Sequence, residues 1–205
     1  MEKGNTREQI LEVSLDLFSV NGYEATSIAQ IADAVGIRKA SLYSHFSSKQ
    51  DILDNVVESV LSGYAKHSIF ANADWDDPEF TKDKRGMGAE DAAKMIQGQI
   101  RYILHDPDIK RGRKMLMIEQ FRNEELAGLQ TRINYEDVLR YFEGMIRFMI
   151  REGRLKNTDT KIMAAQFSSP ITVWINLCDR EPERENEVMD LVHRHVMRFF
   201  DVYSK

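Results

Sequence analysis

A short segment near the N-terminus collects side chains that can donate hydrogen bonds to phosphates or to base edges. Between Asp33 and Asp51 the sequence has no acidic residue, while Arg38, Lys39 and Lys49 add positive charge. Cationic and hydroxyl groups on one helix face are those that contact the backbone and base edges of DNA. The polar face of this segment offers Arg38, Lys39, Ser41, Tyr43, Ser44 and His45. We therefore predict a DNA-binding surface.

Two short helices joined by a glycine turn are expected to position these side chains. Ser27 and Gln30 have the spacing of a capping box at the start of the first helix. Gly36 can adopt the left-handed conformation that ends this helix. The second helix is predicted from about Arg38 to His45. Two helices of this length around a tight turn form a helix-turn-helix, whose second helix enters the major groove.

The same segment resembles the DNA-binding domain of the TetR family of transcriptional regulators. The resemblance covers roughly residues 6 to 53, about a quarter of the chain. It rests on Phe18, Gly22-Tyr23, Thr26-Ser27, Ile31-Ala32, Gly36-Ile37, Ser41-Leu42-Tyr43, His45-Phe46 and Ser48-Lys49. No single dipeptide in this set is specific, but the combination is.

The resemblance implies DNA contacts from Lys39, Ser41 and Tyr43. It also implies that Lys49 and the helix start at Thr26 and Ser27 contact phosphates. The sequence departs from the family pattern at Arg38, where a Ser or Thr cap is usual, and at Ala40, which stands near a usual Gly or Pro. Arginine cannot cap in the same way, so we expect a weak start to the reading helix and a DNA-contacting role for Arg38. Ser44 is small where the family often has bulkier residues, so the resemblance does not establish a DNA contact for Ser44.

Helical periodicity continues through the rest of the chain, and no β-alternation of useful length interrupts it. The predicted fold is all-α with about nine helices, comprising an N-terminal three-helix DNA-binding domain at residues 1–47 and a C-terminal helical effector-binding and dimerisation domain at 48–205. Residues 71–88 are predicted to be a loop, and residues 124–153 one long helix. Pro170 is expected to kink or break the helix that Asp159 caps.

Methionine and aromatic residues crowd the second half, where nine of the ten methionines lie beyond residue 86. Flexible, polarizable methionines suit a cavity for apolar ligands, although each one could equally fill a gap in the core. The resemblance implies that this domain binds a small effector. The predicted ligand-binding residues are Met95, Gln99, Tyr102, Met117, Phe121, Met145, Phe148, Met149, Phe167 and Trp174.

The last two helices are predicted to form a homodimer interface, as such helices do in similar proteins. A two-fold dimer would present two reading helices about 34 Å apart, matching successive major grooves. The alternative is that these apolar residues pack inside one chain. The predicted dimerisation residues are Ile171, Ile175, Val188, Leu191, Val192, His195, Val196 and Phe199.

Composition limits the class of protein further. The formal net charge of -5 argues against a generally basic nucleic-acid coat, but it leaves room for a local basic surface. The single cysteine, Cys178, cannot form an internal disulfide, which favours a reducing cytoplasm. The polar start and the lack of a long apolar run predict neither a secretion signal nor a membrane span.

These observations predict a dimeric regulator, most simply a repressor that a small apolar effector releases from palindromic operator DNA. Two alternatives stay open: a helix-turn-helix adaptor for other proteins, and a helical-bundle enzyme. A di-metal bundle needs two Glu-x-x-His pairs, whereas the chain offers one related spacing, Asp190-x-x-His193. We therefore expect no enzymatic activity, no cofactor and no metal site.

Overall fold

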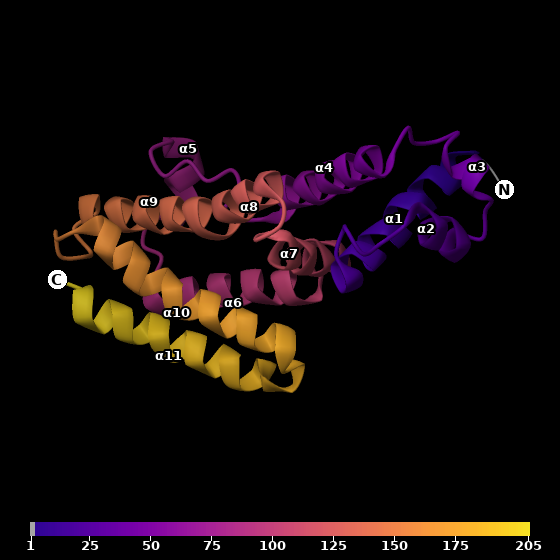
Figure 1. Ribbon diagram of the computed structural model, residues 1–205. Helices are drawn as coiled ribbons and strands as arrows, with labels where there is room; N and C mark the ends of the chain where they lie inside the picture. The colour runs from indigo at the N-terminus through magenta and orange to yellow at the C-terminus, as the bar shows by residue number, and fades with distance from the viewer. Residues whose placement is uncertain (1–2) are drawn as a thin grey trace. The chain divides into compact units, whose positions relative to one another are not determined.

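The computed structural model describes the backbone of residues 3–205 and the side chains from Thr6 onward. Over this range the chain is all-helical, with eleven α-helices and no named strand (Figure 1). An isolated β-bridge pairs Leu155 with Ser204. The predicted all-α fold class is confirmed.

The helices form two compact units, and the chain passes between them more than once. The first unit runs to His67 and also contains Asp106–Thr131, while the second contains Ser68–His105 and Arg132–Lys205. These units describe packing within the chain, and the functional division into residues 1–47 and 48–205 stays a prediction.

The first unit surrounds the helix-turn-helix. Its helices are α1 (Lys3–Asn21), α2 (Ile28–Val35), α3 (Lys39–Leu42), α4 (Lys49–His67), α7 (Pro107–Glu119) and α8 (Glu124–Thr131). Helix α1 packs against α2, α4 and α7. Phe18, Ile31, Leu42 and Phe46 are buried together in this core, which fixes the two short helices against α1.

Local capping interactions set the ends of these helices as the sequence predicts. The Ser27 hydroxyl accepts from the Gln30 N–H, and the Gln30 side chain accepts from the Ser27 N–H at 2.7 Å, forming a complete capping box. Gly36 ends α2 with φ of 77°. The Ser48 hydroxyl accepts from the Asp51 N–H at the start of α4.

The second unit is built around a large apolar core. Its helices are α5 (Pro78–Thr81), α6 (Ala89–His105), α9 (Asp137–Arg151), α10 (Thr160–Arg180) and α11 (Glu185–Tyr203), with short 3₁₀ turns at Lys82–Lys84 and Pro182–Arg184. Figure 1 shows α10 and α11 side by side, and α6 also packs on α11. The Phe167 ring centroid lies 4.8 Å from those of Phe142 and Phe199, at the centre of this core.

One prediction about these helices was wrong, and two were right in part. The predicted loop at 71–88 contains α5, because Asp77 caps it and Pro78 occupies its first turn. The predicted long helix at 124–153 is helical from Glu124 to Arg151, but a π-helical stretch, Arg132–Glu136, divides it. Pro170 does not break α10, which runs from Thr160 to Arg180, and a kink at this residue stays a prediction. Packing of α10 against α6, α9 and α11 accounts for its continuity.

The contact of Gly144 with Trp75 gives a test of packing in the second unit. A Cβ at Gly144 would lie 2.6 Å from Trp75 Cδ1, whereas a Cβ at Gly98 would meet nothing within 4 Å. Both glycines are helical, so alanine gains similar helix propensity at each. We expect Gly144→Ala to be less stable than Gly98→Ala by about 1–3 kcal/mol, the usual cost of overpacking. Urea unfolding of both variants measures this difference, and equal stabilities would contradict the packing.

Candidate nucleic-acid interface

The predicted reading helix is shorter than expected. Helix α3 spans Lys39–Leu42 instead of Arg38 to His45, and the chain continues as turns to His45. Arg38 occupies the N-cap position with extended backbone and makes no capping hydrogen bond through its side chain. The side-chain cap is therefore absent, as expected from Arg38, and the weak start of this helix stays a prediction.

Buried apolar residues hold this short helix while its polar residues face outward. Leu42 and Phe46 are buried, whereas Arg38, Lys39 and Ser41 are exposed. Among the described residues, Arg38 and Lys39 form no ion pair, so their charges are available to a ligand. Such exposed, unpaired cations beside hydroxyl groups suit contacts with phosphates and base edges.

The remaining predicted residues of α3 and its following turn differ in exposure. Tyr43 is 48% exposed, and its hydroxyl forms no hydrogen bond with the described residues. This hydroxyl is therefore available to a ligand. Ser44 is exposed, but its hydroxyl donates to the Ser41 carbonyl at 2.7 Å. His45 is half-buried. Tyr43 therefore offers the stronger contact, and Ser44 the weaker one.

One predicted DNA contact does not fit the structure. The Thr26 side chain is buried, and its hydroxyl donates to the Gly22 carbonyl at 2.8 Å. It therefore organises the turn between α1 and α2 and cannot contact DNA through its hydroxyl. Ser27, one residue later, is exposed at the start of α2.

Lys49 lies at the start of α4 and is held by the turn between α1 and α2. Its Nζ lies 4.2 Å from the centroid of the Tyr23 ring and donates to the Glu24 carbonyl at 3.4 Å. A cation over an aromatic face is attracted by the ring quadrupole, which restricts where the ammonium group lies. Burial, with smaller contributions from Glu24 and Asp54, raises the pKa of Tyr23 above its ordinary value, so the ring stays neutral beside Lys49.

Asp51, in the first turn of α4, is tied to the backbone. The Ser47 N–H donates to the Asp51 carboxylate at 2.7 Å, and the Ser47 hydroxyl also donates to it. These hydrogen bonds lower the pKa of Asp51, which therefore stays ionised at the start of α4. The negative charge of Asp51 is favoured here because it lies at the positive end of the α4 helix dipole. The Asp51 carboxylate bonds to Ser47, so it does not pair with the cations of Lys49 and α3.

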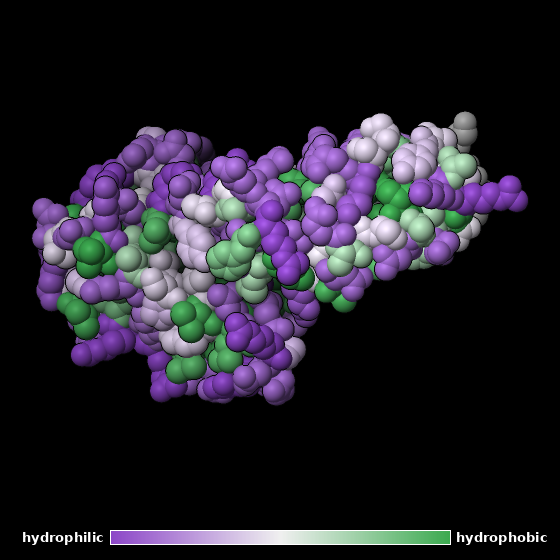
Figure 2. Space-filling model, in the orientation of Figure 1, coloured by the Kyte–Doolittle hydropathy of each residue, from purple (hydrophilic) through white to green (hydrophobic). Residues whose placement is uncertain are grey.

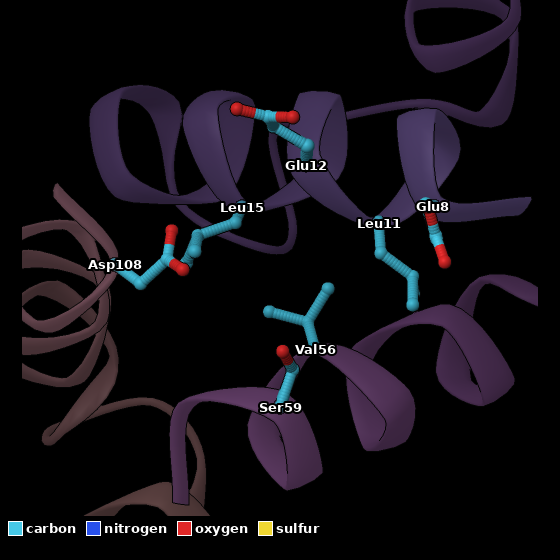
Figure 3. A pocket seen from close by; sticks show the side chains of 7 residues that line it. All are labelled: Glu8, Leu11, Glu12, Leu15, Val56, Ser59 and Asp108. Carbon is cyan, nitrogen blue, oxygen red and sulfur yellow. The ribbon is translucent and has the colours of Figure 1, made fainter. Parts of the chain in front are cut away.

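The first unit also contains a pocket of about 200 Å³, whose charged lining residues are acidic whereas those at α3 are basic (Figure 3). Its lining residues are Glu8, Leu11, Glu12, Leu15, Val56, Ser59 and Asp108. Leu11, Leu15 and Val56 point into the space between α1 and α4 in Figure 3. Three of the seven lining residues are acidic and none is basic, although Glu12 and Asp108 form ion pairs with Arg111, so the pocket offers no cation to a phosphate.

The predicted effector residues are not all brought together. Met117 and Phe121 belong to the first unit, while the other eight belong to the second. Phe121 is 89% exposed, so the prediction that it lines a ligand pocket was wrong. Met145, Phe148, Met149 and Phe167 are buried in the core of the second unit, Gln99 is buried on α6, and Met95, Tyr102 and Trp174 are half-buried.

Sequence reasoning missed an aromatic cluster in the second unit. The Trp75 ring centroid lies 5.4 Å from that of Tyr141, which lies 5.1 Å from that of Phe70. Trp75 Nε1 and Gln99 Nε2 are buried donors without a partner among the described residues. Burial raises the pKa of Tyr141, so its hydroxyl stays protonated. Trp75 was overlooked because it stands among acidic residues of the predicted loop; a tryptophan in such a polar stretch is itself a signal.

The predicted dimerisation residues also need correction. Ile171, Val188, Val192, Val196 and Phe199 are buried inside the second unit, so they cannot form a surface for a partner. Ile175, Leu191 and His195 are half-buried. Figure 2 shows hydrophobic residues on the surface where Figure 1 places α10 and α11. The exposed large apolar residues of these helices are Ile162, Val173, Met197 and Val202.

Comparison with known proteins identifies the helix-turn-helix. Residues 10–56 match the family described as "Bacterial regulatory proteins, tetR family". The chain is 39% identical over 59 residues to the HTH-type transcriptional repressor KstR2 of Rhodococcus jostii, covering 29% of each chain. It is 42% identical over 66 residues to the biofilm operon icaADBC negative transcriptional regulator IcaR of Staphylococcus aureus, covering 32% of this chain and 35% of IcaR. The matches thus span about a third of these relatives.

The likeness in fold extends further along the chain. SmeT, the repressor of the Stenotrophomonas maltophilia multidrug efflux pump SmeDEF, has a TM-score of 0.59. It is 24% identical, and the match covers 97% of this chain and 90% of SmeT.

Residues 10–56 therefore match the TetR-family DNA-binding domain. The chain also shares its fold with a solved structure described as a "putative TetR-family transcriptional regulator" from Mesorhizobium loti, with a TM-score of 0.66 at 17% identity over the full length of both chains. The predicted resemblance is confirmed. Within the described residues, no helix is both long and apolar enough to cross a membrane.

Proposed function

We propose that this protein is a homodimeric transcriptional repressor that binds palindromic operator DNA through Arg38, Lys39, Ser41 and Tyr43. The observation that supports this most strongly is the exposed, acid-free surface of α3 within a TetR-family helix-turn-helix. Ser27 and Lys49 would contact phosphates beside it, with His45 and Ser44 at its edge. The matched family and fold point to a DNA-binding regulator and not to an enzyme.

The homodimer would use the exposed apolar residues of α10 and α11. A single helix-turn-helix makes few contacts, whereas a two-fold dimer reads two half-sites with identical helices. Val173 is 63% exposed and, with Ile162, supplies apolar surface on α10. Half-buried Ile175 and Leu191 lie on the same two helices and could extend this surface.

The effector would bind in the second unit, in keeping with a functional division into residues 1–47 and 48–205. The aromatic cluster around Trp75 and the nearby methionines suit an apolar ligand. Buried donors without partners cost roughly 1–3 kcal/mol each, so an acceptor group on a ligand would be favoured here. We infer an effector with an apolar or aromatic body and at least one hydrogen-bond acceptor. It would release DNA if it binds the DNA-incompetent state more tightly.

In vitro selection of duplexes bound by the full chain tests the function. We expect a palindromic consensus with half-sites about one or two helical turns apart. Apolar compounds with carbonyl or ether acceptors are then titrated against the selected complex at fixed salt. No enrichment of any duplex would overturn the DNA-binding function. Enrichment of single, unpaired half-sites would contradict the dimer, and ligands that bind without changing DNA affinity would contradict the release mechanism.

A further inference from the structure

Glu119 is a buried acid that contacts the helix-turn-helix from a distant part of the sequence. It lies at the end of α7 and is 1% exposed. Its Oε1 accepts a hydrogen bond from the backbone N–H of Tyr23 at 2.8 Å. A carboxylate removed from water is costly unless hydrogen bonds satisfy it, so the Tyr23 N–H is a significant partner.

The turn between α1 and α2 is shaped to receive this carboxylate. Gly22 has φ of +83°, a conformation that side chains disfavour. A Cβ at Gly22 would lie 2.7 Å from Glu119 Oε1 and 3.2 Å from Ile118 Cγ2. Glycine is therefore required here both by the backbone conformation and by the closeness of α7.

Tyr23 also contacts residues at the start of α4. Its hydroxyl donates to Gln50 Oε1 at 3.0 Å, and Lys49 Nζ lies over its ring. Its ring also meets Phe18 edge to face, with centroids 5.5 Å apart. Tyr23 is thus fixed from three sides, with Glu119 on its backbone, Phe18 on its ring and Gln50 on its hydroxyl.

We propose that Glu119 is a positioning residue for DNA binding, which holds Tyr23 so that the ammonium group of Lys49 meets a phosphate. This inference rests on the proposed function, and it adds a role for α7 in setting the DNA-binding surface. Helix α7 begins two residues after α6 ends at His105, so it is also joined by the chain to the second unit.

The test compares Glu119→Gln and Glu119→Leu in the full chain, using the duplex selected with the wild-type protein. Glutamine keeps an acceptor oxygen for the Tyr23 N–H, while leucine removes it at similar size. We expect Glu119→Gln to bind within about twofold of wild type, and Glu119→Leu to bind roughly tenfold more weakly, as for loss of a hydrogen bond to a charged group. The salt dependence of binding supplies the decisive measurement. Glu119→Leu should lower the slope of log affinity against log salt by about one, because Lys49 would no longer neutralise a phosphate.

A purely structural role predicts a different result. A destabilised but correctly shaped protein would bind with the wild-type salt slope once its folded fraction, measured by circular dichroism, is taken into account. That outcome, or unchanged affinity of Glu119→Leu, would overturn the inference. If Glu119→Leu does not fold, Glu119→Asp keeps the charge and withdraws the oxygen by one methylene; a wild-type slope in that variant would also overturn it. Failure of the wild-type protein to bind any duplex would instead reject the proposed function.

Discussion

Replacing Arg38 or Lys39 with alanine is expected to weaken operator binding by about 1–3 kcal/mol if the side chain reads a base. The reason is that both cations are exposed, lie at the start of α3 and form no ion pair among the described residues. Replacing both should cost more than either single change. Fluorescence anisotropy with the selected duplex measures the loss.

The same measurement separates base reading from phosphate binding. If Arg38 reads a base, Arg38→Ala reduces the preference for the selected duplex over a scrambled one. If Arg38 binds a phosphate, the substitution weakens binding to both duplexes equally and lowers the salt slope by about one. Lys66→Ala is the matched control, because Lys66 is an exposed cation at the far end of α4. Equal, small effects of all three substitutions would favour a helix-turn-helix that binds proteins instead of DNA.

The features predicted correctly from sequence are those that depend on neighbouring residues. The capping box of Ser27 and Gln30 and the left-handed Gly36 involve residues within one turn, so residue type and spacing are sufficient to predict them. The burial of Leu42 and Phe46 also follows from their spacing, but helix α3 was predicted too long, since it ends at Leu42 and the chain continues as turns.

Features that depend on tertiary contacts were less predictable. Val188, Val192 and Val196 form an apolar stripe, and such a stripe can pack against a partner chain or within one chain. Their burial in the second unit shows that they pack within the chain. The contact between Tyr23 and Glu119 joins residues 96 positions apart, and no local pattern marks it. Gly22 is the residue whose type could have indicated this contact, because a glycine in a turn can mark the close approach of another segment as well as a positive φ.

Val173→Asp is expected to convert the proposed dimer into a monomer. Val173 is 63% exposed on α10, so aspartate is tolerated in an isolated chain. In a two-fold interface the substitution would introduce two buried, unpaired carboxylates, whose desolvation costs several kcal/mol each. We expect the dimer dissociation constant to rise by at least about 100-fold, equivalent to roughly 3 kcal/mol. Sedimentation velocity across a range of concentrations measures this shift.

Val20→Asp is the matched control, because Val20 is 75% exposed on α1 in the first unit and is not part of α10 or α11. It makes the same chemical change on a surface not assigned to the interface, so its oligomeric state should equal that of wild type. If Val173→Asp remains a dimer while keeping its fold, the interface does not include this face of α10. If it becomes monomeric yet still binds the full palindrome with wild-type affinity, dimerisation in solution is not what brings two reading helices to the operator.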